Sequence, residues 1–158
     1  MPMAFYRKTS ASYQRQNCAM TLREALDEFY SINAHKFGRP EPKTKWTKLL
    51  VHHDIGHVIF GVNTTLIDET AGDIWTLLAT DMTFNEYRQY LKTPEAKELL
   101  KELGVANIIK ATLCFVPLAS KIYSRSRKMT KEWSFRDYEK YMDMPLGEIR
   151  ESFNLRIL

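Results

Sequence analysis

The chain has 158 residues, of which 44% are hydrophobic and 12% aromatic, so one hydrophobic core can form without disulfides or a second domain. The net charge of +4 is too small to indicate nucleic-acid binding, and without a recognised nucleic-acid motif we expect no nucleic-acid partner. Cys18 and Cys114 lack metal-site spacing and are expected to be packing residues in a reducing compartment.

Helical periodicity dominates the sequence, and no convincing alternating strand pattern is present. We therefore expect an all-α, single-domain helical bundle of about seven to eight helices. The opening stretch is basic, because the first acidic residue is Glu24. Residues 1–20 are predicted to be a flexible or surface-docked N-terminal arm, followed by a helical metal-binding domain over residues 21–158.

Start and stop signals divide this domain into helices. Thr21 can cap the first helix, which is expected to run to about His35 and to end before a loop rich in Gly and Pro. The stretch 105–127 is the most apolar and is interpreted as a central core helix with a kink at Pro117. The predicted helices after the first cover residues 46–61, 66–80, a short stretch from 83, a segment restarting at 93–94, then 105–127, 134–142 and 145–155.

The helix over residues 46–61 carries a candidate metal-binding motif. An α-helix turns about 100° per residue, so His53 and His57 share one face and Asp54 borders it. The neighbouring His52 points away from that face. We expect His52 to be an outer-shell or solvent-facing residue rather than a metal ligand.

The chain is expected to reverse near Asn63. Gly61 and Asn63 suit the left-handed turn that ends a helix, and Thr65 with Asp68 resembles a capping box that begins the next one. The metal motif should therefore lie on an antiparallel helical hairpin.

This hairpin brings an acidic residue to the histidines. His57 and Glu69 lie equally far from Asn63 on either side, so they should face each other at the same height. The same register places Asp73 opposite His53, where Asp73 is a candidate outer-shell partner that orients a ligand imidazole.

Imidazole and carboxylate ligands together suit one divalent metal. The predicted ligands favour zinc with an open coordination position, and iron, manganese or magnesium are alternatives that spacing does not separate. The other interpretation is that the histidines only form hydrogen bonds within an amphipathic helix. The predicted metal ligands, which are also the expected catalytic residues, are His53, Asp54, His57 and Glu69.

The same four residues, with eleven positions between His57 and Glu69, resemble the signature of the Coq-four family of ubiquinone (coenzyme Q) biosynthesis. Residues 141–150 are similar to the family's closing segment of proline, leucine, an acidic residue and arginine. The resemblance covers roughly residues 20 to 157.

The resemblance implies an all-helical, metal-binding protein that is peripheral on the membrane holding the quinone pool. Its expected partners are a polyprenylated quinone precursor and other ubiquinone-biosynthesis enzymes, with a homo-oligomer as an option. The implied activity is that of a metal-dependent lyase (decarboxylase), which removes the C1 carboxylate of 4-hydroxy-3-methoxy-5-polyprenylbenzoate-type substrates with oxidation. The implied location is cytoplasmic for a bacterial-type chain and the mitochondrial inner membrane for a eukaryotic one.

In such a reaction the metal would act as a Lewis acid for negative charge developing on the ring. Gly56 lies between the two histidines, where the lack of a side chain either admits a flat ring or serves helix packing. The candidate pocket walls, which are otherwise simply core residues, are Leu49, Leu50, Phe60 and Trp75.

The densest basic run follows the apolar stretch. It has two interpretations: cations placed at a helix C-terminus, or attraction to anionic lipids worth about 1 kcal/mol per residue. We favour the anionic membrane surface, with Tyr123 and Trp133 as interfacial anchors. The expected membrane-contacting cations are Lys121, Arg125, Arg127 and Lys128.

Two other functions remain open. The doublet of His53 and Asp54 also resembles that of the HD-domain metal phosphohydrolases, which need a further upstream histidine, here His35, and a downstream aspartate, here Asp137 or Asp143. The second alternative is a non-catalytic scaffold whose metal stiffens the hairpin while a groove presents a prenyl lipid to partner enzymes.

Overall fold

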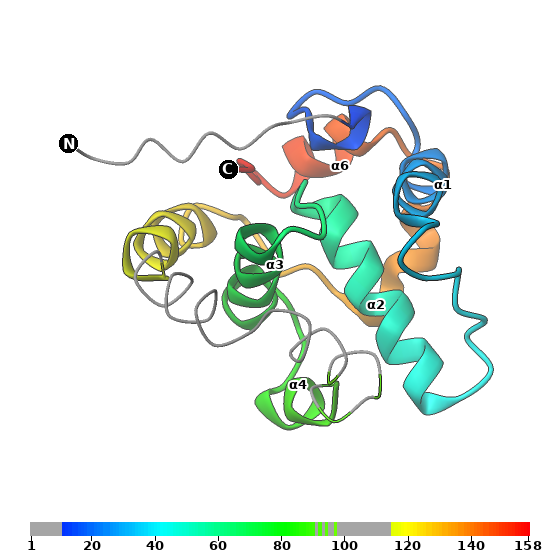
Figure 1. Cartoon of the computed structure of the whole chain (residues 1–158). Helices are drawn as coiled ribbons and strands as arrows, with labels where there is room; N and C mark the ends of the chain where they lie inside the picture. The colour runs from blue at the N-terminus through cyan, green and yellow to red at the C-terminus, as the bar shows by residue number, and fades with distance from the viewer. Residues whose placement is uncertain (1–10, 91, 93, 95–96, 98–114) are drawn as a thin grey trace.

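Figure 1 shows the computed structural model of the chain, which describes residues 11–90, 92, 94, 97 and 115–158. The described residues contain helices and isolated bridges but no strand, which confirms the predicted all-α, single-domain bundle. The segment restarting at residues 93–94 is described only in part, and residues 105–114 of the stretch 105–127, which include Cys114, lie outside the described residues. The helices are η1 (Ser12–Gln14), α1 (Leu22–Asn33), α2 (Lys45–Ile59), α3 (Leu66–Ala79), α4 (Phe84–Tyr90), η2 (Phe135–Tyr141) and α6 (Leu146–Ser152), and residues 115–126 are also helical.

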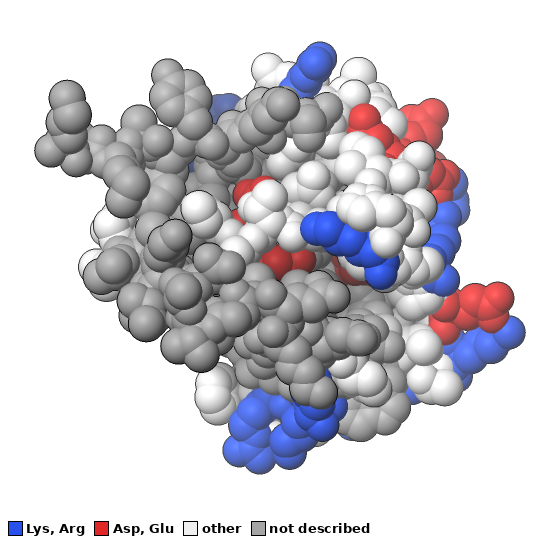
Figure 2. Space-filling view, in the orientation of Figure 1, with Lys and Arg blue, Asp and Glu red and all other residues white. Residues whose placement is uncertain are grey.

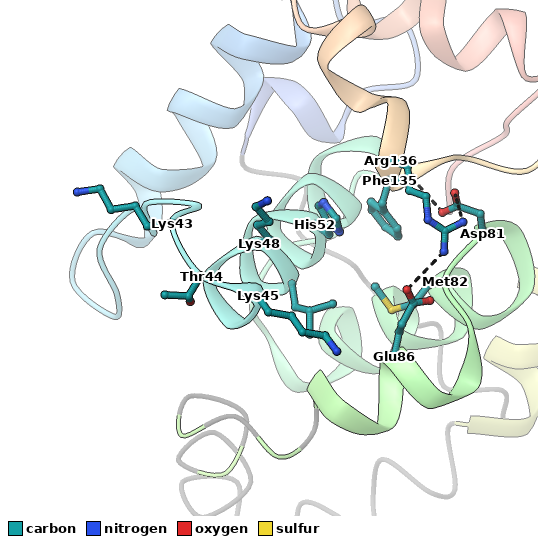
Figure 3. A pocket seen from close by; sticks show the side chains of 11 residues that line it. Lys43, Thr44, Lys45, Lys48, His52, Asp81, Met82, Glu86, Phe135 and Arg136 are labelled. Atoms are coloured by element: carbon teal, nitrogen blue, oxygen red, sulfur yellow. Dashed lines mark hydrogen bonds and ion pairs between the residues drawn. The ribbon is translucent and has the colours of Figure 1, made fainter.

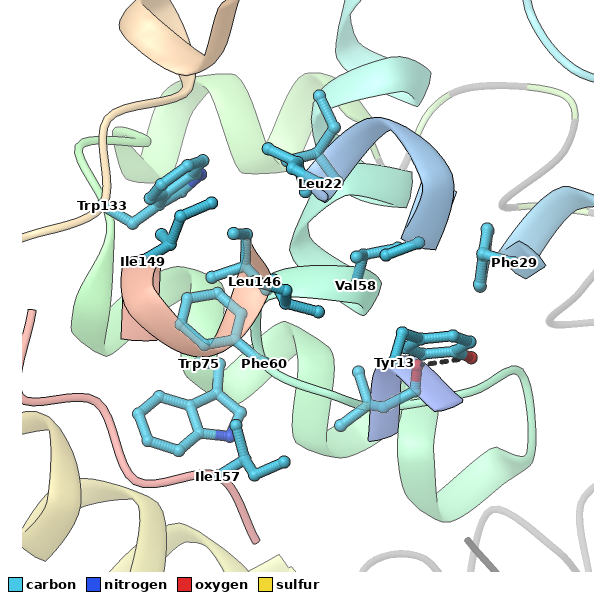
Figure 4. Packing of buried hydrophobic residues seen from close by; sticks show 14 of the residues in the cluster. Tyr13, Leu22, Phe29, Val58, Phe60, Trp75, Trp133, Leu146, Ile149 and Ile157 are labelled. Carbon is cyan, nitrogen blue, oxygen red and sulfur yellow. Dashed lines mark hydrogen bonds between the residues drawn. The ribbon is translucent and has the colours of Figure 1, made fainter. Parts of the chain in front are cut away.

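Helix α2 occupies the centre of the fold and packs against α1, α3 and α4. Because it has neighbours on several sides, buried residues lie around much of its circumference rather than on one stripe. The core next to it joins distant parts of the chain, as Figure 4 shows for Phe29, Val58, Phe60, Trp75 and Leu146. The Phe60 and Trp75 rings stack with centroids 4.9 Å apart, so these residues are core rather than pocket walls.

Threonine caps fix where the first three α-helices begin. The Thr21 and Thr65 hydroxyls accept hydrogen bonds from backbone N–H groups three residues ahead, as predicted, and Thr44 does the same for α2. The observed ends of α1, α2 and α3 lie within about two residues of the predicted ends, which is the usual precision of helix boundaries.

The turn between α2 and α3 uses one left-handed residue. Gly61 has φ of +63°, whereas Asn63 does not have positive φ. Asn63 instead stabilises the turn through its side-chain oxygen, which accepts from the Thr64 N–H and from the Asn33 amide. The chain then runs back along α2 as α3, which forms the hairpin that the sequence predicted (Figure 1).

The expected N-terminal arm is wrong for its described part. Residues 1–10 lie outside the described residues, but Tyr13 and Cys18 are buried in the core. The segment pairs with the C-terminal region, where the Gly147 and Leu146 N–H groups donate to the carbonyls of Cys18 and Met20 at 2.8 Å. Residues 11–20 therefore belong to the folded domain.

Arg150, in the segment that resembles the family's closing motif, is completely buried. Its guanidinium donates to the carbonyls of Val58 and Ile59 at the end of α2, and to those of Tyr13 and Arg15. Since the last carbonyls of a helix have no partner within it, this side chain caps α2 and ties both chain ends to the motif helix.

The helical residues 115–126 do not form the predicted central core helix. Phe115 and Val116 are 47% and 71% exposed, and Ile122 is the fully buried residue of this stretch. The predicted kink at Pro117 depends partly on residues outside the described ones. Within the described residues, none of the helices has the length and apolar character needed to cross a membrane.

Candidate metal centre

Three of the four predicted ligands lie together. His53 and His57 project from successive turns of α2, and their Nε2 atoms are 2.9 Å apart. Glu69 reaches across from the first turn of α3, and its Oε2 atom is 3.5 Å from each of these nitrogens. The hairpin register predicted this contact, and the ligand atoms of the three residues lie within 4.8 Å of one another.

The ionisable groups of this cluster are buried close together, so the charge of each one changes the pKa of the others. The side chains of His57 and Glu69 are 1% and 11% exposed. Burial lowers the pKa of His57, but the Glu69 carboxylate, with smaller effects of Asp54 and Asp73, outweighs it and raises the pKa to about 9. Burial alone would raise the pKa of Glu69, and the imidazoles of His57 and His53 hold it well below its ordinary value. The site therefore favours a positive charge between the rings and the carboxylate.

The donor set fits a divalent metal. Tetrahedral zinc with bonds of about 2.0–2.1 Å needs ligand atoms roughly 3.3 Å apart, close to the separations between Glu69 and the histidines. The two imidazole nitrogens, at 2.9 Å, need only a small outward movement. An added Cβ at Gly72 of α3 would lie 3.9 Å from the His57 ring, which is ordinary van der Waals contact.

On its Nδ1 side, the His57 ring is held by packing rather than by a hydrogen bond. The Phe29 ring stacks on it at 5.2 Å between centroids. Among the described residues, the Nδ1 atom of His57 has no hydrogen-bond partner. Metal-bound histidines usually donate this second N–H to a carboxylate or carbonyl, so this centre relies on an aromatic contact instead.

Asp54, the fourth predicted ligand, is not part of the close group. It is buried, and its Oδ2 atom accepts a 2.8 Å hydrogen bond from the Tyr30 hydroxyl of α1. Burial raises the pKa of Asp54, and the charges of His53 and His57 oppose this shift. Asp54 therefore acts on the histidines through its charge, from a position beside the ligands.

Asp73 has a matching environment on the other helix of the hairpin. Burial raises its pKa, the charge of His53 opposes this shift, and its side chain hydrogen-bonds to Tyr87 of α4. Its predicted position near His53 agrees with this electrostatic contact. No sequence pattern indicates Tyr30 or Tyr87 as partners, because a tyrosine on the apolar face of a helix is usually a core residue.

His52 lies on a different face of α2. Its ring stacks on Phe135 with centroids 5.5 Å apart and nearly parallel planes, and it meets Tyr138 edge-on. Gly56 faces the same side, where an added Cβ would lie 3.5 Å from the Phe135 ring. Gly56 thus faces Phe135 rather than the ligand group, and His52 stands apart from the ligands as well.

The residues that the phosphohydrolase alternative needs do not converge on the doublet. His35 is exposed, Asp137 is paired with Lys140, and Asp143 is paired with Arg23 at the surface. An HD-type ligand set is therefore absent from the described residues around His53 and Asp54.

The candidate membrane cations occupy different environments. Lys121, Arg127 and Lys128 are exposed, whereas Arg125 donates to the carbonyls of Arg156 and Ile157 in the C-terminal segment. Trp133 is only 1% exposed, so it is a core residue and not an interfacial anchor. In Figure 2 the Lys and Arg side chains of the described residues lie in several separate groups, some beside acidic ones.

A comparison of the chain with protein-family models, curated proteins and solved structures finds no significant match. The resemblance to the Coq-four family is therefore carried by the four motif residues and the segment 141–150 alone. What the described structure supports directly is that His53, His57 and Glu69 can hold a metal ion.

Proposed function

We propose that this protein binds one divalent metal, zinc by preference, through His53, His57 and Glu69. The observation that carries this proposal is the meeting of three buried ligand atoms from two helices at one point. Iron, manganese and magnesium are the competing metals, and the two imidazoles favour zinc or iron over magnesium.

We propose further that the centre serves ubiquinone biosynthesis by acting on the head group of a polyprenylated hydroxybenzoate. Its support is the motif resemblance, strengthened by the contact of Glu69 with both histidines. In the balanced reaction the bond from C1 to the carboxylate breaks and releases carbon dioxide, and a bond from C1 to a water oxygen forms. Dioxygen accepts the two electrons and becomes hydrogen peroxide.

A bound metal would supply Lewis-acid stabilisation of negative charge on the ring or its phenolic oxygen. The chain's own residues would hold and polarise this centre. Glu69 spans both histidines, and Asp54 and Asp73 place further negative charge beside the imidazoles. The Tyr30 and Tyr87 hydroxyls fix these two carboxylates by hydrogen bonds.

The membrane-facing part of the proposal rests on the exposed residues of the 115–128 stretch. Phe115 and Val116 are exposed large apolar residues, and Lys121, Lys128 and Arg127 are exposed cations within about three turns of them. Co-sedimentation with anionic liposomes at low salt tests this contact. Replacing Lys121 and Lys128 by Glu should weaken retention, and binding that is indifferent to both lipid charge and this change would contradict it.

Metal content is the first test of the proposed centre. Protein purified without chelators should contain close to one equivalent of metal by elemental analysis, and the Glu69→Gln variant should lose it. Glu148→Gln is the matched control, because Glu148 is an exposed glutamate on α6. Equal metal content in the two variants would rule out the centre.

Turnover separates the enzyme from the scaffold. Protein loaded with metal should release labelled carbon dioxide from a carboxyl-labelled prenylated hydroxybenzoate in air, with an equal amount of hydrogen peroxide. Metal binding with tight retention of this compound but no carbon dioxide would instead establish the scaffold, and would leave the metal proposal intact.

A further inference from the structure

A separate cavity of about 340 Å³ lies on the His52 side of α2 (Figure 3). Its walls come from the segment 43–52 at the start of α2, the connection between α3 and α4, the first turn of α4 and the start of η2. This volume lies at the lower end of the range for small-molecule sites, so it suits a ligand with about one ring. Nothing in the proposed metal chemistry uses this cavity.

The charge of the lining is positive. Four cationic side chains face two carboxylates, Asp81 and Glu86, and both carboxylates already have partners. Asp81 accepts from the Ser134 hydroxyl and the Phe135 N–H, while Arg136 lies 3.6 Å from Asp81 and 3.4 Å from Glu86.

Two of the cations remain available to a ligand. Lys43 is paired with Glu41 outside the cavity, whereas Lys45 and Lys48 form no ion pair within the described residues. Both lysines belong to the first turns of α2, where the helix dipole adds to their positive potential. The cavity thus presents uncompensated positive charge at one side.

The other side of the cavity is flat and largely apolar. The parallel stack of His52 and Phe135 forms one wall, and Leu49 and Met82 contribute further apolar surface. A flat ring can therefore pack against this wall.

We propose that this cavity is a binding site for a small organic anion with an aromatic body, of which an aromatic carboxylate is the simplest case. The anionic group lies toward Lys45 and Lys48, and the ring packs against Leu49, Met82 and the His52–Phe135 stack. The site is distinct from the metal centre, because His52 and Gly56 face Phe135 while His53 and His57 face Glu69.

Titration of the full-length protein by two-dimensional amide NMR tests the proposal, with benzoate as the probe. Benzamide tests the need for charge and acetate tests the need for a ring. The test variant is the double replacement Lys45→Glu and Lys48→Glu, and Lys128→Glu is the control, because Lys128 is an exposed cation outside the cavity. Every titration is repeated with the Glu69→Gln protein in chelator.

Benzoate should shift the amides of residues 44–52, 81–86 and 135–136 in a saturable manner. The affinity of the double variant for benzoate should be at least about tenfold lower than that of the native protein. The native protein should bind benzamide and acetate at least about tenfold more weakly than benzoate. A tenfold loss corresponds to about 1.4 kcal/mol of binding free energy. Benzoate binding should persist in the Lys128→Glu and Glu69→Gln proteins. The absence of saturable shifts, equal affinity for acetate, or loss of binding with Glu69→Gln would each overturn the site, the last by placing the anion at the metal.

Discussion

The neighbouring residues His52 and His53 show how one helix can separate two kinds of chemistry. His53 meets a carboxylate, with its Nε2 atom 3.5 Å from Glu69, whereas His52 stacks on Phe135 in a cavity lined by cations. A single residue step along α2 turns the side chain by about 100°, which moves it from the Glu69 carboxylate to a cavity whose lining contains more cations than carboxylates. The acidic face suits a cation, and the basic face suits an anion.

The pKa values of the imidazoles on the two faces are also shifted in opposite directions. Burial lowers the pKa of both His52 and His57, but at His57 the nearby carboxylates outweigh burial and raise it. The balance between burial and the surrounding charges therefore decides the protonation state of each histidine at neutral pH. The sequence pair alone does not distinguish the two cases.

Replacing one histidine on each face by alanine should give the largest difference between the faces in metal affinity. His53→Ala deletes a ligand atom and should weaken metal affinity by more than the roughly 10- to 100-fold typical of an outer-shell partner. His52→Ala should leave metal affinity unchanged, because its ring contacts Phe135 and Tyr138 instead. Competition with a chromophoric chelator measures both affinities, and similar losses in the two variants would show that His52 belongs to the metal centre.

The pH dependence of stability should also differ between metal-free and metal-loaded protein. Without metal, the pKa of His57 is raised from 6.5 to about 9, so its stabilising effect is complete below pH 6.5 and is lost as pH rises through 9. The free energy of unfolding should fall over this window by an amount on the order of 1–3 kcal/mol. With metal bound, His57 carries no proton in the folded protein, so this loss should disappear and stability should stay nearly constant above about pH 7.5.

Urea unfolding at pH 6, 7.5 and 9 measures this difference. Glu69→Gln is the control, since the Glu69 carboxylate is the main cause of the raised pKa of His57. This variant should show a flatter metal-free profile. A metal-free native protein that gains stability toward pH 9 would contradict the proposed coupling.

The two tyrosine–aspartate pairs should have smaller effects. Tyr30→Phe and Tyr87→Phe remove the hydroxyls that fix Asp54 and Asp73, and each should lower metal affinity by about tenfold. Tyr138→Phe is the matched control, because Tyr138 contacts His52 on the other face. Isothermal titration calorimetry in a weakly chelating buffer measures the three variants, and the idea fails if all three bind metal as the native chain does.

The sequence predicted the hairpin well because its determinants are local. The Thr65 cap, the left-handed Gly61 and the register about Asn63 are sufficient to bring Glu69 to both histidines. Helix periodicity likewise separated His52 from His53. Each of these features depends on residues close together in the chain.

Features that depend on distant partners were not predictable in the same way. The partner of Asp54 is Tyr30 of another helix, and the carbonyls capped by Arg150 lie about ninety or more residues earlier in the chain. The composition of residues 11–20 is that of a basic arm, whereas in the fold the carbonyls of Cys18 and Met20 accept from the Gly147 and Leu146 N–H groups. The apolar content of the 115–126 stretch indicated burial, but apolar content does not say which neighbours cover a helix.

Gly56 gives the smallest and most discriminating test of the two faces. An alanine Cβ there would lie 3.5 Å from Phe135 and 3.9 Å from Thr76, which is ordinary van der Waals contact. Because Gly costs about 0.5–1 kcal/mol relative to Ala inside a helix, Gly56→Ala should stabilise the protein by up to this amount in urea unfolding. Gly61→Ala, at φ of +63° and with a Cβ 2.9 Å from Ile157, should destabilise it. The metal content and the turnover of Gly56→Ala should both match those of the native chain. If a flat substrate ring instead needed the space at Gly56, this variant would lose turnover while its metal content stayed constant.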